Sequence, residues 1–277
     1  MLAIVQTFSN CFKIPELKSR IIFTLLLLSI CRLIALVPVP GLDGALLSDF
    51  LAQTAEQDDR SLLGMYSLFT GGALERCAIG SLGIMPYISA TIIIQLMTAV
   101  LPGLSKLARE EGGRAKIIQY GRYLTLILCL GQGFVMALGW ENPAKIFDGF
   151  TGQLVLSDAI WWYRIQTVLV LTTGTLLLMW LGEQITERGI GNGISLVITI
   201  GILARLPSAV NQVYTMFFPP EGVVAQYNLL HLVGLVLIFA AVTALVIAVT
   251  QAQRKIPVQY AQRAVGRKVY SGGSSFM

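Results

Sequence analysis

The stretch Leu62–Pro102, LLGMYSLFTGGALERCAIGSLGIMPYISATIIIQLMTAVLP, holds two apolar pieces of unequal length. The second piece, Ile79–Leu101, has about the 20 residues that a helix needs to cross a bilayer. The first piece, Leu62–Leu74, is too short to span, and the charged pair Glu75-Arg76 separates it from the second. A short apolar helix that ends in glycines beside a full span indicates a broken or re-entrant helix. Membranes tolerate such a backbone only against protein or a water-filled path.

The composition of the chain is that of a membrane protein. Its mean hydropathy is +0.71, and of its 277 residues 55% are hydrophobic and 13% are charged. Soluble domains carry about 25% charged residues. The apolar runs therefore predict an all-α polytopic membrane protein with six transmembrane helices and one re-entrant half-helix. The expected spans are Ile21–Val39, Ile79–Leu101, Ile118–Leu138, Trp161–Leu181, Ile194–Leu206 and Leu229–Thr250.

The segments between the spans give the expected loops and the orientation. Pro86 lies inside the second span, where we expect a kink. With six spans, most of the 20 Lys and Arg residues fall on the side of the N-terminus, so the positive-inside rule places both termini in the cytoplasm. We expect an interfacial amphipathic segment before Ile21, a charged loop at Ser105–Lys116, a tight polar turn at Gly182–Gly193, a loop at Pro207–Asn228 and a basic soluble tail from Gln251.

The residues of the chain offer little for catalysis or for metal binding. No G-x-S-x-G or H-E-x-x-H motif occurs, no apolar run contains an aspartate, and His231 is the single histidine. The cysteines are widely spaced and form no metal or redox pair, so we interpret them as small core residues. They are Cys11, Cys31, Cys77 and Cys129. We therefore expect no enzyme, no metal and no cofactor.

Several residues in the spans have a structural and a functional interpretation. An arginine in the bilayer costs about 2.5–3.5 kcal/mol on insertion scales, so Arg32 should face the bundle or an interface, and a structural partner is favoured over a substrate contact. Ile84 and Ile88 lie four residues apart on one helix face, and Ile194 and Ile198 repeat this spacing. Spacing alone favours ordinary helix packing over a pore lining.

Two alternative functions fit a membrane bundle with a broken helix. A small-solute secondary transporter would use the broken helix as its binding site. That function requires polar side chains converging at mid-membrane, whereas the candidate faces here are rich in isoleucine. A non-conducting membrane scaffold is the other alternative.

Four strings of the chain resemble the SecY family, the channel subunits of the Sec protein translocase. TGGALERCAIGSLGIMPYISATIIIQLMTAVLP is similar to the plug and second helix of that family, and MWLGEQITERGIGNGISLVI to its fourth-to-fifth helix turn. RLIALVPVPGLDG is similar to the end of its first helix, and QRKIPVQYAQRAVGRKVYSGGSS to the basic loop after its sixth. The matches occur in the family's order and cover essentially the whole chain.

The resemblance implies roles for individual residues of a protein-conducting channel. The first piece would be the plug that closes the channel from its outer side, and a ring of apolar side chains would exclude water and ions at the constriction. One helix would form a wall of the lateral gate, through which membrane helices leave for lipid, and a basic loop would dock the ribosome or the SecA motor. The implied residues are Met65, Tyr66, Leu68, Phe69, Gly71, Gly72 and Leu74 for the plug, Ile84, Ile88, Ile194 and Ile198 for the ring, Ser89, Ile92 and Gln95 for the gate, and Arg254, Lys255, Arg263, Arg267 and Lys268 for docking. Gln262 departs from many relatives, which have a basic residue there.

The resemblance also implies a domain organisation and partners. The family has ten spans in two inverted halves, so six spans and the ending SGGSSFM favour a truncated, N-terminal portion. The implied partners are the small subunits SecE and SecG, SecA, the ribosome, signal peptides, nascent chains and the lipid of a bacterial cytoplasmic (inner) membrane. The implied domains are a cytoplasmic amphipathic segment at 1–20, a five-helix half at 21–206 with its plug at 62–74, an outer hinge loop and sixth helix at 207–250, and a truncated basic cytoplasmic loop at 251–277.

Overall fold

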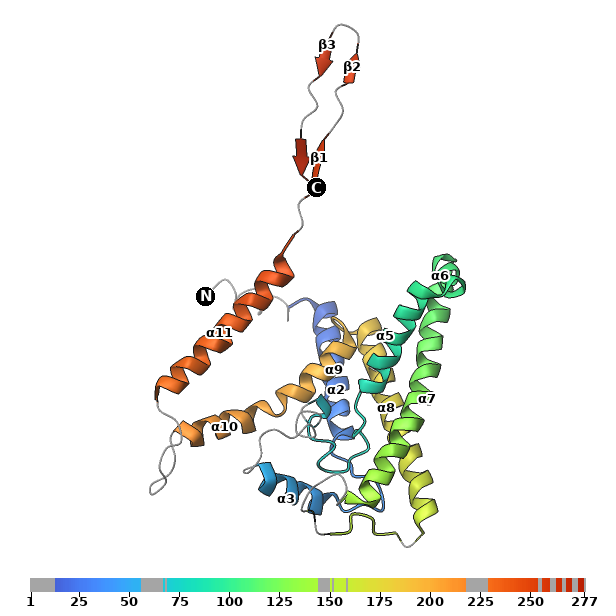
Figure 1. Cartoon of the computed structure of the whole chain (residues 1–277), viewed down its shortest axis with the longest axis vertical. Coiled ribbons are helices and arrows are strands. Elements are labelled where there is room, and N and C mark those ends of the chain that lie inside the picture. Colours follow the sequence, from blue (N-terminus) through green and yellow to red (C-terminus); the bar gives the residue numbers. More distant parts are fainter. Residues whose placement is uncertain are drawn as a thin grey trace. The chain divides into compact units, whose positions relative to one another are not determined.

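A computed structural model describes residues 13–55, 67, 69–143, 150, 152–157, 159–217, 229–253, 256–259, 263–265, 268–270 and 274–276. The chain divides into two units, Met1–Ala209 and Val210–Met277, and each is described by itself. The described helices of the first unit are α2 (Pro15–Ile34), α3 (Gly44–Ala55), α5 (Met85–Val100), α6 (Pro102–Arg109), α7 (Gly113–Glu141), α8 (Ile160–Arg188) and α9 (Gly193–Leu203), and α10 (Leu206–Phe217) begins there and continues into the second unit (Figure 1).

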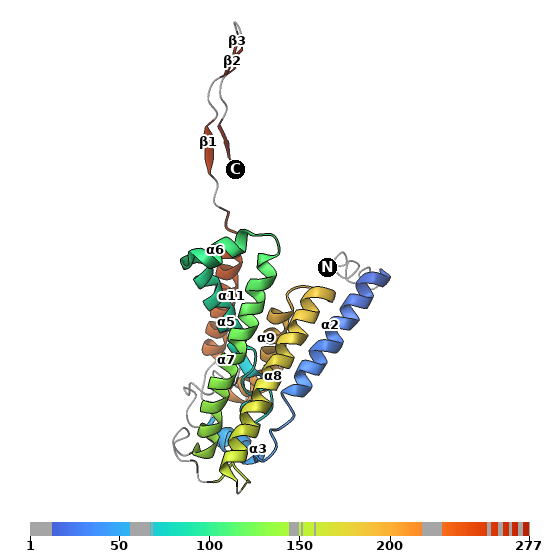
Figure 2. The same cartoon turned by 90° about the vertical axis from the view of Figure 1, so that its right-hand side faces the viewer.

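The helices α7 and α8 form an antiparallel pair at the centre of the first unit (Figure 2). Near one end of the pair, the Arg122 guanidinium donates to both Glu183 carboxylate oxygens over 3.0 and 2.8 Å. At the other end, Arg164 donates to both oxygens of Glu141 over 2.9 and 3.0 Å. Small buried residues at four-residue spacing on α7 let α8 approach closely. They are Gly121, Thr125, Cys129, Gly133 and Ala137.

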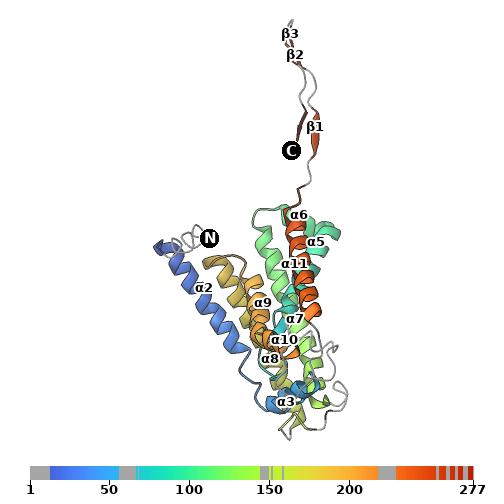
Figure 3. The same ribbon diagram turned by 90° about the vertical axis from the view of Figure 1, so that its left-hand side faces the viewer.

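The remaining long helices of the first unit pack on this pair. The helices α8 and α9 lie between α2 on one side and α5 and α7 on the other (Figures 2 and 3). One hydrophobic cluster joins α2, α8, α9 and the start of α5, with Leu28, Ile84 and Leu181 among its buried members. A second cluster lies at the α3 end, where Trp140, Leu154 and other side chains are buried.

The second unit contains the rest of α10, the long helix α11 (Leu229–Gln251) and four short strands. None of the apolar side chains described for α11 is buried, which is typical of a helix that faces lipid or a partner. The tail, expected only as a basic soluble segment, contains two antiparallel pairs. β1 (Pro257–Gln259) pairs with β4 (Ser274–Phe276), and β2 (Arg263–Val265) pairs with β3 (Lys268–Tyr270).

The helices confirm the predicted all-α membrane bundle. Among the described residues, four helices are long and apolar enough to cross a membrane, namely α7, α8, α9 continued by α10, and α11. The pair α5 and α6, bent by 99°, would give a fifth. The helix α2 has 20 residues and is long enough to span, but it is not among these candidates because it carries the charges of Lys18, Arg20 and Arg32.

Several expected element ends were wrong. The helix α5 begins at Met85, six residues after the expected start at Ile79, and Pro86 occupies its first turn, so it begins the helix and does not kink it. A first-turn proline needs no backbone N–H partner, whereas a proline inside a helix removes one.

The other differences concern segments that were expected to be loops. Part of the charged segment at Ser105–Lys116 is α6 and the start of α7, and most of Gly182–Gly193 continues α8 to Arg188. Leu206–Phe217 is helical where a loop was expected from Pro207. At the N-terminal side, α2 begins at Pro15, before the expected boundary at Ile21. Charge and proline marked these segments as loops, but both residue types occur readily in first and last helical turns.

Candidate functional site

The short apolar piece ends at two glycines with left-handed backbone. Ser67, Phe69 and Thr70 are helical, and Gly71 and Gly72 then have φ values of +64° and +86°. The amide of Gly72 donates to the Ser67 carbonyl over 2.9 Å, and this bond satisfies one of the carbonyls at the end of the helix. A turn over residues 71–84 leads to α5. The predicted break between the two apolar pieces is therefore confirmed, while Met65, Tyr66 and Leu68 lie outside the described residues.

The part of this turn that follows the glycines is anchored in the protein. Leu74, Cys77 and Ala78 are buried, at 2%, 0% and 0% exposure. The amide of Val39 donates to the Cys77 carbonyl over 2.9 Å, and the amide of Ile79 donates to the Val37 carbonyl over 2.9 Å. These bonds fix the turn to the segment that follows α2.

A buried serine provides a second anchor inside the same turn. The Ser81 hydroxyl lies within hydrogen-bonding distance of the Ala73 carbonyl at 3.0 Å and of the Ala78 carbonyl at 2.5 Å. Ser81 itself is 0% exposed. Each carbonyl also accepts a backbone amide, Ala73 from Ala78 and Ala78 from Ser81, so the hydroxyl adds a further buried hydrogen bond that stabilises the turn.

Two arginines lie near the glycine pair, Arg32 on α2 and Arg205 in the turn between α9 and α10. Nη2 of Arg32 on α2 donates to the Gly71 carbonyl over 3.3 Å. Nη2 of Arg205, which follows α9, forms an ion pair with Oε1 of Glu75 over 2.5 Å. Arg32 therefore has the structural partner that was expected for an arginine within a span. The charges of Arg76 and Arg205 also act on Arg32, while Arg205 is paired with Glu75.

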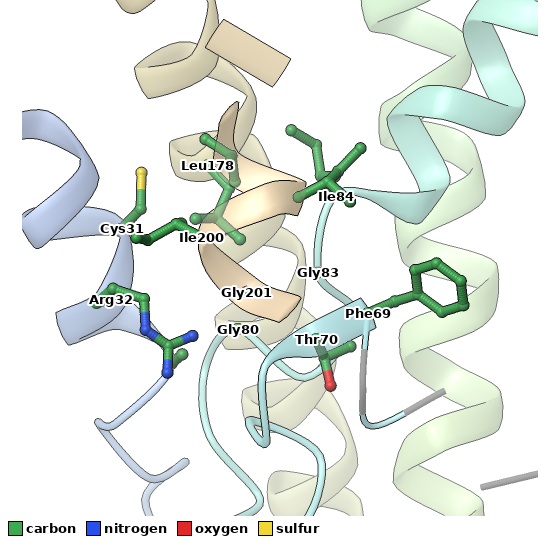
Figure 4. A pocket seen from close by; sticks show the side chains of 13 residues that line it. Cys31, Arg32, Phe69, Thr70, Gly80, Gly83, Ile84, Leu178, Ile200 and Gly201 are labelled. Carbon is green, nitrogen blue, oxygen red and sulfur yellow. The ribbon is translucent and has the colours of Figure 1, made fainter. Parts of the chain in front are cut away.

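A small cavity lies beside the glycine pair (Figure 4). Its volume is about 30 Å³, enough for one or two water molecules. Its walls come from α2, α8, α9, the short apolar piece and the turn before α5. The side chain of Arg32 extends toward it from α2 (Figure 4). The residues that line the cavity include Arg32, Thr70, Gly83, Ile84, Leu178 and Gly201.

The four isoleucines of the expected ring all belong to one hydrophobic cluster. Ile84 is 6% exposed and is a buried member, while Ile88, Ile194 and Ile198 are half-buried and pack against that cluster. Ile84 precedes α5, and its carbonyl accepts from the Ile88 amide over 3.2 Å, so the expected four-residue relation between these two is kept. Ile84 and Ile198 also line the cavity beside the glycines.

The remaining expected site residues lie on α5 and in the tail. On α5, Ser89 is half-buried, Ile92 is 51% exposed and Gln95 is exposed. In the tail, Arg263 begins β2 and Lys268 begins β3. Arg254, Lys255 and Arg267 lie outside the described residues.

Sequence reasoning missed two residues of this site. Arg205 and Gly201 were not expected to lie beside Glu75 and the short helix, because the two segments are far apart in the chain. An added Cβ on Gly201 would lie 3.3 Å from the Phe69 carbonyl oxygen, so a small residue is needed for the short helix to approach α9. A glycine inside an otherwise apolar helix was the available signal.

Comparison with known proteins relates the chain to one family. The family model described as SecY matches residues 78–276. The Escherichia coli (strain K12) protein translocase subunit SecY is 45% identical over 263 residues, covering 95% of this chain and 56% of that protein. The Streptomyces coelicolor subunit of the same name is 40% identical over 276 residues, covering 99% and 61%. The chain thus spans about three fifths of the length of these curated relatives.

Two solved structures are also similar. The structure of a protein conducting channel matches 93% of this chain and 52% of its own, at 16% identity and a TM-score of 0.47. Sec61 in the canine ribosome-channel complex matches 73% and 39%, at 18% identity and a TM-score of 0.45.

Proposed function

This chain belongs to the SecY family, and we propose that it serves as a channel subunit that passes unfolded, signal-bearing polypeptides across the cytoplasmic membrane and releases membrane helices sideways into it. One observation carries the proposal. A short helix ends at two left-handed glycines, and the four isoleucines of the expected constriction pack into one cluster beside it. A closed channel can exclude water and ions at an apolar constriction, and the short helix beside it would block the path.

The constriction would exclude water and ions because its side chains have no hydrogen-bonding groups. Isoleucine offers no hydrogen-bonding group, so a narrow ring of such side chains disfavours water and hydrated ions. The same ring can contact any extended polypeptide through dispersion forces, without a preference for one sequence. The ring would consist of Ile84, Ile88, Ile194 and Ile198, and the short helix with Phe69, Gly71, Gly72 and Leu74 would be the plug that closes the path from the outer side.

The exit toward lipid and the contact with the driving machinery would lie on two other segments. Ser89, Ile92 and Gln95 on α5 would form one wall of the lateral gate, and the exposure of Ile92 supports an apolar surface for a departing helix. Arg254, Lys255, Arg263, Arg267 and Lys268 would give the tail the positive charge that binds ribosomal RNA or an acidic motor surface.

The partners follow from the family. We propose that the chain assembles with SecE and SecG, and that it works with SecA or a ribosome in the cytoplasmic membrane of a bacterium. Both of its termini would lie in the cytoplasm, as the distribution of Lys and Arg indicates.

The conductance of ring variants tests the proposal. The full chain with its partner subunits is placed in a planar bilayer, and ion conductance is recorded for Ile88→Ser combined with Ile198→Ser. The hydroxyls should hydrate the constriction, so we expect a conductance several-fold above that of the unmodified protein. Ile127→Ser is the matched control, because Ile127 is 64% exposed on α7, away from the cluster. Equal conductance in the ring variant and the control would contradict a constriction at these residues.

A further inference from the structure

The exposed side of α8 carries a row of mostly apolar side chains that begins and ends with a tryptophan. We propose that this row, the α8 stripe, contacts the lipid of the membrane, and that its two tryptophans lie at the two levels where hydrocarbon meets headgroups. The α8 stripe consists of Trp162, Ile165, Leu169, Thr173, Leu177 and Trp180. The inference goes beyond the proposed function, because it concerns the surface that meets the bilayer and holds whether or not the chain conducts.

The members of the α8 stripe share one face of the helix. Successive members are three or four residues apart, which places them one above the other along the helix axis. All of them are exposed in the part of the chain that the structure describes. The other side of α8 is packed against its neighbours, and Thr167, Leu171 and Leu178 are among its buried residues. The helix therefore has one packed side and one exposed side.

The side chains of the α8 stripe suit a hydrocarbon environment. Ile165, Leu169 and Leu177 are aliphatic, and the Thr173 hydroxyl donates to the Leu169 carbonyl of its own helix over 2.7 Å. Hydrocarbon offers no hydrogen bonds, so a polar group that faces lipid must be satisfied within its own segment. The stripe meets this demand without a partner protein.

The length of the α8 stripe fits a bilayer. A helix rises about 1.5 Å per residue, so Trp162 and Trp180 are separated by about 27 Å along the axis. The hydrocarbon core of a bilayer is about 30 Å thick. Tryptophan has an amphipathic ring that favours the headgroup level. One tryptophan at each end of this length is therefore the arrangement expected of a helix side that spans the hydrocarbon.

The charges of α7 and α8 complement the same layer. The two helices run side by side (Figure 2), and the ion pairs Arg122–Glu183 and Arg164–Glu141 join them at two levels. Between these pairs, residues 123–140 of α7 and 165–182 of α8 include no charged side chain. On each helix this uncharged band is again about 27 Å long. Since a charge in hydrocarbon is costly, the band fits the hydrocarbon core and the ion pairs fit the headgroup levels.

The kind of side chain in the α8 stripe favours lipid over a further protein helix. Helices that pack closely in membranes do so through small residues. Gly174 and Gly182 of α8 are buried within the first unit. An added Cβ on Gly174 would collide with the Ile79 carbonyl oxygen, and one on Gly182 would lie 3.3 Å from Cγ1 of Ile194. These small residues are thus already used for packing, and the stripe presents mainly large side chains.

The tryptophans of the chain allow a direct test. Trp161, Trp162 and Trp180 are 74%, 66% and 52% exposed, whereas Trp140 is 2% exposed. Variants that keep one tryptophan and have phenylalanine at the other three positions are reconstituted in phosphatidylcholine vesicles, each as the full chain with its partner subunits. The lipid carries bromine, which quenches tryptophan fluorescence on contact, either close to the headgroup or close to the bilayer centre.

The two lipids should distinguish the ends of the α8 stripe from its middle. We expect the shallow bromine to quench Trp162 and Trp180 at least about two-fold more than the deep bromine does. Leu169→Trp, in a chain whose own tryptophans are all replaced by phenylalanine, should show the reverse order, because position 169 lies near the middle of the stripe. Trp140 is the matched control, and neither lipid should quench it, because it is buried.

Three results would overturn the proposal. If neither lipid quenches Leu169→Trp, protein covers the α8 stripe. If quenching occurs with the chain alone and is lost when the partner subunits are added, a partner helix occupies this face. If both lipids quench Trp162 equally, the ends of the stripe do not lie at the headgroup levels.

A charge placed in the uncharged band gives a second measurement that does not depend on fluorescence. Leu169→Lys puts an ammonium group in the middle of the band, so it should lower the amount of chain in the membrane fraction several-fold. Leu156→Lys is the matched control, because Leu156 is 69% exposed and precedes α8, outside the band. Equal amounts of the two variants in the membrane would overturn the placement of the band in hydrocarbon.

Discussion

At the scale of single residues, the site depends on positions where only one residue type fits. Gly71 and Gly72 each have a left-handed backbone and an arginine side chain at the place that an added Cβ would meet. Glycine meets both demands, because it has no Cβ to strain the backbone or to displace the guanidinium. The sequence predicted a break here from Gly71-Gly72 and Glu75-Arg76. It could not predict which arginine would meet which partner, because that depends on how distant segments pack.

Gly72→Ala should destabilise the fold. A methyl group at φ +86° strains the backbone by roughly 1–2 kcal/mol, and Arg205 must also shift. We expect a melting temperature several degrees lower in detergent, measured by intrinsic fluorescence. Gly131→Ala is the control, since an added Cβ there meets nothing within 4 Å and alanine favours a helix. A melting temperature for Gly72→Ala equal to or above that of the control would show that this position tolerates a side chain.

Ser81→Ala should also be destabilising. The change removes the buried hydrogen bond of the hydroxyl, while the Ala73 and Ala78 carbonyls keep their backbone donors, so the cost should be about 0.5–1.5 kcal/mol. Ser29→Ala is the matched control, because the Ser29 hydroxyl is exposed and bonds only to its own helix. Thermal melting of both variants measures the difference, and an equal effect would mean that Ser81 does not hold the turn.

At the scale of elements, the sequence predicted the helical type of the long apolar segments better than the number of helices or their ends. The apolar run before α5 is continuous, so the span was expected to begin at Ile79. In the structure, residues 79–84 form a turn, since the backbone at Gly83 is left-handed and Pro86 favours a helix start. Conversely, part of α6 was expected to be a loop, because Ser105–Lys116 is short and charged, but α6 is helical over its eight residues. Short segments and segment ends are decided by neighbouring packing as much as by local propensity.

The position of Pro86 gives a prediction at this scale. Because it occupies the first turn of α5, Pro86→Ala should change the free energy of unfolding by less than about 1 kcal/mol. Ala90→Pro, one turn further on and buried, should cost about 3 kcal/mol or more by removing a helical hydrogen bond. A large loss of thermal stability in Pro86→Ala would instead indicate that the proline has a role inside the helix.

The two ion pairs of the α7–α8 hairpin should differ in strength. The Arg164 and Glu141 side chains are 22% and 18% exposed, and Arg164 also lies 5.1 Å from the Trp161 ring centre. The Arg122 side chain is 45% exposed, so water and salt weaken its pair with Glu183. A double-mutant cycle with Arg164→Met and Glu141→Gln should give the larger coupling energy, and the Arg122→Met and Glu183→Gln cycle less than about 1 kcal/mol. The reverse order would contradict this reading of the hairpin.

At the scale of the whole molecule, family membership and the site point to one arrangement. Composition predicted a membrane bundle, and the helices and the family confirm it. The role of the isoleucines could not be predicted from spacing, because four-residue spacing is equally typical of ordinary helix packing. In the structure all four lie in or against one hydrophobic cluster, and the constriction proposed above rests on that arrangement.

The most direct test of a polypeptide path through this molecule is crosslinking to an arrested translocating chain. Cysteines are placed at Ile88 and Ile194 in the full protein with its partner subunits, and at Ile127 on the exposed side of α7 as the control. A secretory polypeptide with a single cysteine, stalled midway, should form a disulfide with the first two positions and not with the third. If the stalled chain forms no disulfide with cysteines at Ile88, at Ile194 or at the gate position Ser89, the polypeptide does not pass along this cluster.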